Sequence, residues 1–208
     1  LVKGFQPYYI LHDMTFTLTS FIFILILAPL TGLAGGFFRR FFQWAEKNQT
    51  KSKSILWQLP AIALMTGLVA YFFPEIMGNG RSLAQFAINS QQMHLVVVLV
   101  CGALLKVIIT VLTIRAGAAG GTLTPSIAVG SALGAVLVLL LNFFLPGVSV
   151  GQGAILGAGT LLAASQQAPF MAMFMLIEIT HLNYSALLPL ALGIIISSAV
   201  SRKVLSKS

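Results

Sequence analysis

Apolar residues in this sequence gather into long runs that contain almost no charge. The run at residues 16–38 is 23 residues long and has no charged side chain. About 20 such residues are enough for a helix to cross the hydrocarbon core of a bilayer. Over the whole chain only 8% of residues are charged, whereas a soluble domain has roughly a quarter. We therefore expect an all-α, polytopic membrane protein.

The runs divide residues 1–208 into helical segments of one transmembrane domain. Pro29 is expected to bend the first segment. Residues 150–165 and 169–180 are too short to cross a core of about 30 Å comfortably. Short, interrupted segments of this kind are typical of broken helices that line a substrate site. The longer segments are expected at residues 16–45, 55–73, 94–114, 125–145 and 184–201.

Glycine pairs spaced four residues apart predict close contacts between helices. Gly130 and Gly134 form one such pair, and Gly153 and Gly157 form another. Small residues at this spacing let two helix backbones approach each other in a membrane. A third glycine-rich face, Gly32, Gly35 and Gly36, predicts the same for the first segment.

The net charge of +8 comes from basic residues that cluster beside the apolar spans, at residues 39–53 and 202–207. They are not interleaved with aromatic residues on one face, so a nucleic-acid partner is not expected. Short loops rich in Lys and Arg remain on the cytoplasmic side during insertion. Both clusters are predicted to be cytoplasmic, which requires an even number of crossings between them.

The sequence lacks the residue patterns that a metal site or a catalytic site requires. His12, His94 and His181 are scattered and have no metal-ligand spacing, so neither a metal nor an organic cofactor is expected. An intramembrane serine protease would need a base close to its nucleophile. The available serines, Ser126, Ser131 and Ser165, have no histidine at the matching depth. We expect no enzyme activity.

The stretch at residues 120–125 is the strongest functional signal. Pro125 suits the first turn of a helix, and Thr124 before it is an acceptable N-cap. Gly120 and Gly121 let the chain turn sharply and let an ion approach the backbone. A helix N-terminus points unpaired N–H groups and a positive dipole end outward, which attracts anions. The alternative is an ordinary tight turn between two spans.

Several sequence strings in this region resemble the CLC family of chloride channels and chloride/proton antiporters, of bacterial type. They are AGAAGGTLTPSIAVGSALG at residues 116–134, LLAASQQAP at 161–169, LIEIT at 176–180, and the helix at 106–113 before the first string. The resemblance implies that the chain corresponds to the second half of a fold built from two inverted halves. Its function would be transport of chloride or a similar anion, either as a channel or coupled to protons.

The resemblance also implies a site made from backbone. In the family the amides of the two central motif residues bind the anion, which here are Thr122 and Leu123. Leu123 replaces the usual aromatic residue and Thr124 replaces a small one. Because backbone donors bind the ion, we expect these changes to alter pore width and ion preference and to leave the site intact.

The remaining functional groups implied by the resemblance lie outside this chain. The first half would supply a serine hydroxyl and the gating glutamate, and the inner tyrosine would follow the last long span. The family also implies a homodimer in a bacterial inner membrane, formed through the last two helical segments. Its candidate contacts are Phe170, Met171, Ile177 and Leu188; contact with lipid or with the missing half is an equal alternative.

Charged residues within the spans leave alternatives open. Lys106 and Arg115 could raise the local anion concentration, or they could pair with carbonyl groups and reach toward the interface. Glu178 is the one acid inside an apolar segment. It could carry protons, but its place in the last turn of that segment favours a structural role. A carrier for fluoride or nitrate, or a non-transporting structural membrane subunit, are the other functions considered.

Overall fold

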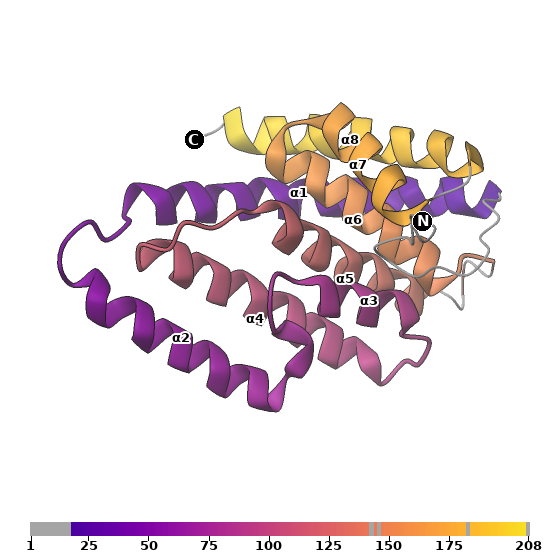
Figure 1. Ribbon diagram of the computed structural model, residues 1–208. Helices are drawn as coiled ribbons and strands as arrows, with labels where there is room; N and C mark the ends of the chain where they lie inside the picture. Colours follow the sequence, from indigo (N-terminus) through magenta and orange to yellow (C-terminus); the bar gives the residue numbers. More distant parts are fainter. Residues whose placement is uncertain (1–17, 142–143, 145–146, 182–183, 207–208) are drawn as a thin grey trace, which may run out of the picture.

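The computed structural model describes residues 18–141, 144, 147–181 and 184–206, and within them every regular element is helical (Figure 1). Five helices are long and apolar enough to cross a membrane: α1, α2, α4, α5 and α8. The α-helices are α1 (Leu18–Lys47), α2 (Ile55–Phe72), α3 (Arg81–Asn89), α4 (Leu95–Arg115), α5 (Leu123–Leu141), α6 (Val150–Gln166), α7 (Pro169–Thr180) and α8 (Leu187–Ser206), with 3₁₀ turns η1 (Pro74–Ile76) and η2 (Tyr184–Ala186).

The short helix α6 is the centre of the molecule. Every residue from Gly151 to Ser165 is buried, and α6 packs against α1, α3, α5, α7 and α8. A capping box begins the helix: Ser149 Oγ accepts from Gln152 N, and Gln152 Oε1 accepts from Ser149 N. A helix too short to span the bilayer can lie here because its neighbours, and not lipid, surround it.

Two glycine pairs form a single antiparallel contact between α5 and α6. A Cβ on Gly130 would stand 2.8 Å from Ala158 Cα, and a Cβ on Gly153 would stand 2.8 Å from Gly134 O. Real Cβ atoms essentially never come so close, so only glycine allows these backbones to touch. The close packing predicted for Gly130, Gly134, Gly153 and Gly157 is confirmed, and the two pairs face each other.

Helices α1 and α8 lie side by side with the same direction (Figure 1). A Cβ on Gly32 would stand 2.7 Å from Ser197 O, and one on Gly36 would stand 3.0 Å from a methyl carbon of Val204. Near the ends of both helices, Arg40 Nη2 donates to Val204 O. Arg39 and Arg40 therefore lie at the same end of the bundle as Arg202 and Lys203.

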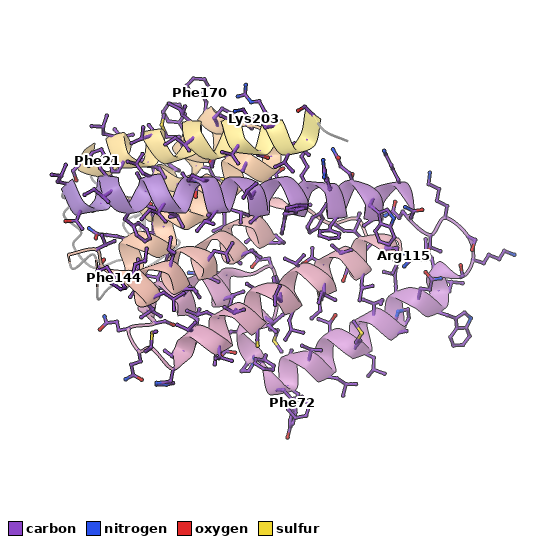
Figure 2. All side chains as sticks on the ribbon, turned by 180° about the vertical axis from the view of Figure 1, so that it is seen from behind. Phe21, Phe72, Arg115, Phe144, Phe170 and Lys203 are labelled. Carbon is purple, nitrogen blue, oxygen red and sulfur yellow. The ribbon has the colours of Figure 1, made fainter. Side chains whose placement is uncertain are left out.

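Two outer faces carry large exposed apolar side chains. Helix α2 lies at the edge of the molecule, where only 6% of its residues are buried. Figure 2 shows Phe72 of α2 and Phe170 of α7 pointing outward from opposite sides, and each is 74% exposed. Helix α1 continues through Pro29 as a single element, so the bend expected there does not interrupt it.

Candidate functional site

The N-terminus of α5 is set back from the end of the bundle, and its first residue, Leu123, is 37% exposed. The loop that follows α4 runs inward, and α5 starts part-way along the length of α1 (Figure 1). At the neighbouring end of α6, Ser165 O accepts from Arg39 Nη1 at 2.9 Å. Arg39 precedes the end of α1 at Lys47 by two turns, about 12 Å along its axis. The start of α5 is thus set back from the basic end of the molecule.

The helix begins at Leu123 and not at Pro125, so Thr122 and not Thr124 takes the capping position. The reason is that Thr122 O accepts the first helical hydrogen bond, from Ser126 N at 3.0 Å. Ser126 Oγ donates to the same carbonyl at 2.6 Å. Pro125 still lies in the first turn, where its missing N–H breaks no helical bond. The amides of Leu123 and Thr124 come before the first bonded amide and have no acceptor within the helix.

The loop before α5 leaves its backbone open. Gly120 and Gly121 are exposed, and no heavy atom outside the local chain lies within 4 Å of where a Cβ would stand on either residue. The sharp turn expected of these glycines occurs earlier, at Gly117, whose φ is +104°. Gly117 lies against Ile55 of α2 and Thr50 O, where a side chain has no room. Gly120 and Gly121 therefore contribute access to the backbone.

A network of polar side chains joins the start of α5 to the end of α6. Gln166 Nε2 donates to Thr122 Oγ1 at 2.9 Å. Ser165 Oγ donates to Ser126 Oγ at 3.0 Å. Gln166 and Arg39 are contacts that sequence reasoning did not single out. The available signal was the polar sequence Ser165–Gln–Gln at the end of an apolar segment, but it does not show which helix these side chains meet.

Residues at the start of α5 line two cavities. The larger, about 900 Å³, lies between α2, α4 and α5, and Gly121, Leu123 and Thr124 are among its lining residues. The smaller, about 180 Å³, is lined by Thr122 and Gln166 together with Arg39 and other residues of α1. Successive residues of the loop thus face different cavities, and Thr122 and Gln166, which are hydrogen-bonded, both line the smaller one.

Lys106 lies in α4 beside the larger cavity and is only 4% exposed. Its Nζ donates to Ile76 O at 3.0 Å and to Gly78 O at 2.6 Å. This follows the expectation that the lysine pairs with carbonyl groups. The turn after η1 also packs on α5, because a Cβ on Gly80 would stand 3.3 Å from Thr124 O. Lys106 therefore holds that turn to α4, beside the first turn of α5.

Arg115 and Glu178 lie away from this junction. The Arg115 guanidinium stacks over the Trp44 ring, 5.1 Å from its centroid, at the end of the molecule where the loop joins α1 to α2 (Figure 2). Glu178 is exposed near the end of α7. Neither side chain lines the two cavities described above.

Two of the serines considered as nucleophiles, Ser126 and Ser165, have other partners. Ser126 and Ser165 bond to each other and to main-chain carbonyls of Thr122 and Leu162. His94 stands at the start of α4 and His181 at the end of α7, while His12 lies outside the described residues. In the described part of the chain, no three metal-binding side chains come together.

Three solved structures share this arrangement of helices. A slow cyanobacterial Cl⁻/H⁺ antiporter has a TM-score of 0.75 and 25% identity, over 94% of this chain and 46% of that chain. A CLC-type fluoride/proton antiporter has a TM-score of 0.70 and 22% identity, over 98% of this chain and 49% of the other. A eukaryotic CLC transporter has a TM-score of 0.74 and 19% identity, over 92% and 34%.

Sequence relatives come from bacteria. The voltage-gated ClC-type chloride channel ClcB of Salmonella typhimurium is 30% identical over 187 residues, which is 85% of this chain and 43% of that protein. A putative chloride channel protein, ClcB-like, from Ralstonia nicotianae is 37% identical over 137 residues, or 64% and 30%. The chain thus spans less than half the length of these relatives. The family described as "Voltage gated chloride channel" matches residues 1–202, and we conclude that this chain is an integral membrane protein of that family.

Proposed function

We propose that this protein moves chloride or a similar small anion across a membrane, and that the backbone amides of Thr122 and Leu123 bind the ion. The observation that supports this most is the start of α5, where a helix N-terminus opens on a cavity between the apolar helices α2, α4 and α5. Gly120 and Gly121 leave room for the ion, and Pro125 keeps the first turn helical without an N–H.

Backbone donors suit an ion that must leave quickly. Amides at a helix N-terminus attract an anion through partial charges. Binding by a full counter-charge would slow release. Lys106 fits this scheme, because its Nζ is engaged by two carbonyl groups. The charge of Lys106 makes the electrostatic potential of the cavity more positive, while the backbone amides bind the anion directly.

We propose further that the chain works as the second half of a longer transporter in a bacterial inner membrane. The first half would complete the ion site beside the larger cavity and the weakly buried α2. A homodimer would form through the face of α7 and α8. Phe170, Met171 and Leu188 are exposed there, while Ile177 is partly packed on the core.

The function is tested by reconstituting the complete protein in liposomes and recording chloride and proton movement under a chloride gradient. Chloride efflux that drives protons in the opposite direction establishes a coupled antiporter. Chloride efflux without a proton signal establishes a channel. Nitrate and fluoride gradients in the same assay identify a carrier for another anion. No movement of any of these ions contradicts the transport function.

The backbone site is tested with Leu123→Pro, which removes one of the proposed donor amides. Proline is well tolerated at the first position of a helix, so the fold of α5 should remain. We expect chloride flux to fall by about tenfold or more, since a hydrogen bond to a charged group contributes about 1.5–3 kcal/mol. Leu123→Ala keeps the amide and should retain flux within about threefold. Unchanged flux in Leu123→Pro would favour a structural role for this stretch.

A further inference from the structure

The loop that leads into the proposed ion site is held at two ends and is open between them. At one end Ala118 N donates to Thr113 O and Ala118 O accepts from Gln49 Nε2. At the other end Thr122 Oγ1 accepts from Gln166. Between these ends Ala119, Gly120 and Gly121 are exposed. The position of the amides at residues 121–123 therefore depends on how firmly Thr122 is held.

Thr122 is held through its side chain and its main chain together. Its carbonyl caps α5 by accepting from Ser126, and its hydroxyl accepts from Gln166. A β-branched side chain has few χ1 states. A hydrogen bond to Oγ1 therefore also restricts the backbone of the residue, including the peptide plane that carries its N–H. Without that bond, only the carbonyl end of Thr122 would remain fixed.

Gln166 is itself anchored to the most rigid part of the molecule. It is the last residue of α6, the helix whose residues from Gly151 to Ser165 are all buried. The preceding residue, Ser165, donates to Ser126 Oγ and accepts from Arg39 through its carbonyl. Gln166 Nε2 also lies 3.5 Å from Ser126 Oγ. The amide group thus transfers the fixed position of α6 to the loop.

We propose that Gln166 is a positioning residue for the ion site: it holds Thr122 so that the loop amides keep one geometry, and this geometry sets the preference between anions. The proposal rests on the function proposed above and deepens it. A site of fixed size discriminates between a spherical ion such as chloride and a larger planar one such as nitrate. A loosened loop adapts to both ions and binds each less well.

The test uses Gln166→Met in the complete protein, because methionine matches the length of glutamine and lacks the donor. Gln167→Met is the matched control. Gln167 is the next residue, and its Nε2 donates to Ala164 O and to Ser201 Oγ of α8. Both variants lose side-chain hydrogen bonds at the end of α6, but only one of them loses the bond to the loop. Thermal unfolding in detergent checks that both are folded.

The readouts are chloride affinity by calorimetry and the ratio of chloride to nitrate flux in liposomes. For Gln166→Met we expect affinity to fall about five- to tenfold and the flux ratio to move toward equality. For Gln167→Met both values should stay within about twofold of wild type. Thr122→Val removes the acceptor and tests the same bond if Gln166→Met fails to fold. The double variant Thr122→Val/Gln166→Met should have the same chloride affinity and flux ratio as either single variant, since each single change removes the same hydrogen bond.

Equal effects of the two methionine variants, or additive effects of Thr122→Val and Gln166→Met, would overturn the positioning role. So would a Gln166→Met protein with wild-type affinity and flux ratio. In each of these cases wild-type flux is intact, and the proposed function stands. A folded wild-type protein that moves and binds neither anion would overturn the proposed function, and the positioning role with it.

Discussion

Helices α5 and α2 are both apolar and both long enough to span a membrane, yet they differ in how much of each is buried. In its most apolar 18-residue stretch 67% of α5 is buried, against 6% of α2. Helix α5 carries glycine and serine on the face toward α6, whereas α2 carries Leu, Trp, Tyr and Phe outward. Small residues therefore mark which apolar helix packs against protein, because lipid gives no hydrophobic reason to bury a large side chain.

The site lies where these two regions meet. One side of the start of α5 is held by the close-packed region, through Gln166 and Ser165 of α6. The other side faces the larger cavity and the loosely attached α2. The rigid packing on the α6 side fixes the backbone donors, and the open cavity on the α2 side leaves them accessible to an ion. The following variants test this division, in order of decreasing expected effect.

The same Gly→Ala substitution should lower the free energy of unfolding in α5 but leave it unchanged or raise it in α2. A Cβ on Gly134 would stand 2.6 Å from Gly153 C, whereas nothing lies within 4 Å of a Cβ on Gly67. We expect Gly134→Ala to destabilise the protein by about 2–3 kcal/mol. Gly67→Ala should be neutral or stabilising by up to about 1 kcal/mol, because alanine favours helix. Chemical unfolding in detergent measures both, and equal effects would remove the distinction between the regions.

Lys106 connects the looser region to the site, so its removal should cost more than removal of Arg115. Lys106→Met leaves the carbonyls of Ile76 and Gly78 without their donor, which we expect to cost about 1–3 kcal/mol. Arg115→Met removes a contact with Trp44 worth about 0.5–1 kcal/mol. Limited proteolysis of the turn after η1 should accelerate only in the lysine variant. A stronger effect of Arg115→Met would refute the anchoring role of Lys106.

The smallest effect is expected from a hydroxyl deep in the packed region. Thr31 Oγ1 donates to Thr160 Oγ1 at 2.9 Å and also to Leu27 O within its own helix. Thr31→Val keeps the shape of the side chain and removes one hydrogen bond between α1 and α6, at a cost of about 0.6 kcal/mol. A shift in thermal unfolding of a few degrees or less is the expected result. A collapse of the fold would mean that hydroxyl bonds, and not glycine contacts, hold this region together.

The helical elements and their glycine contacts follow from local sequence patterns. The pairs at Gly130 and Gly157 predict close packing because spacing alone puts small residues on one face. The first residue of α5 is harder to predict from the sequence, since Thr122 and Thr124 are equally good caps. The helix start depends on which carbonyl accepts the hydrogen bond from Ser126 N. The contact of Gln166 with Thr122 joins residues 44 positions apart, and no local pattern reports it.

The role of α6 in the core could not be predicted from the sequence either. Its shortness indicates a helix that does not face lipid along its whole length, but a helix lining a substrate path and a helix at the core have the same length. Gly151, Gly153, Gly157 and Gly159 distinguish the two only after the packing is known. Figure 1 shows α6 between its neighbours, and it reaches the site through its final two residues alone.

The antiparallel contact of α5 and α6 also bears on how long an ion would stay. The amide end of α5 carries about half a positive charge, and the carbonyl end of α6 beside it carries about half a negative charge. Their fields partly cancel at the junction, so an anion bound there, as proposed, would occupy a shallow energy well. Occupancy would then be brief, and turnover fast, as an ion pathway requires. Under the proposed function, the same close backbone contact that stabilises the bundle would also limit the dwell time of the bound anion.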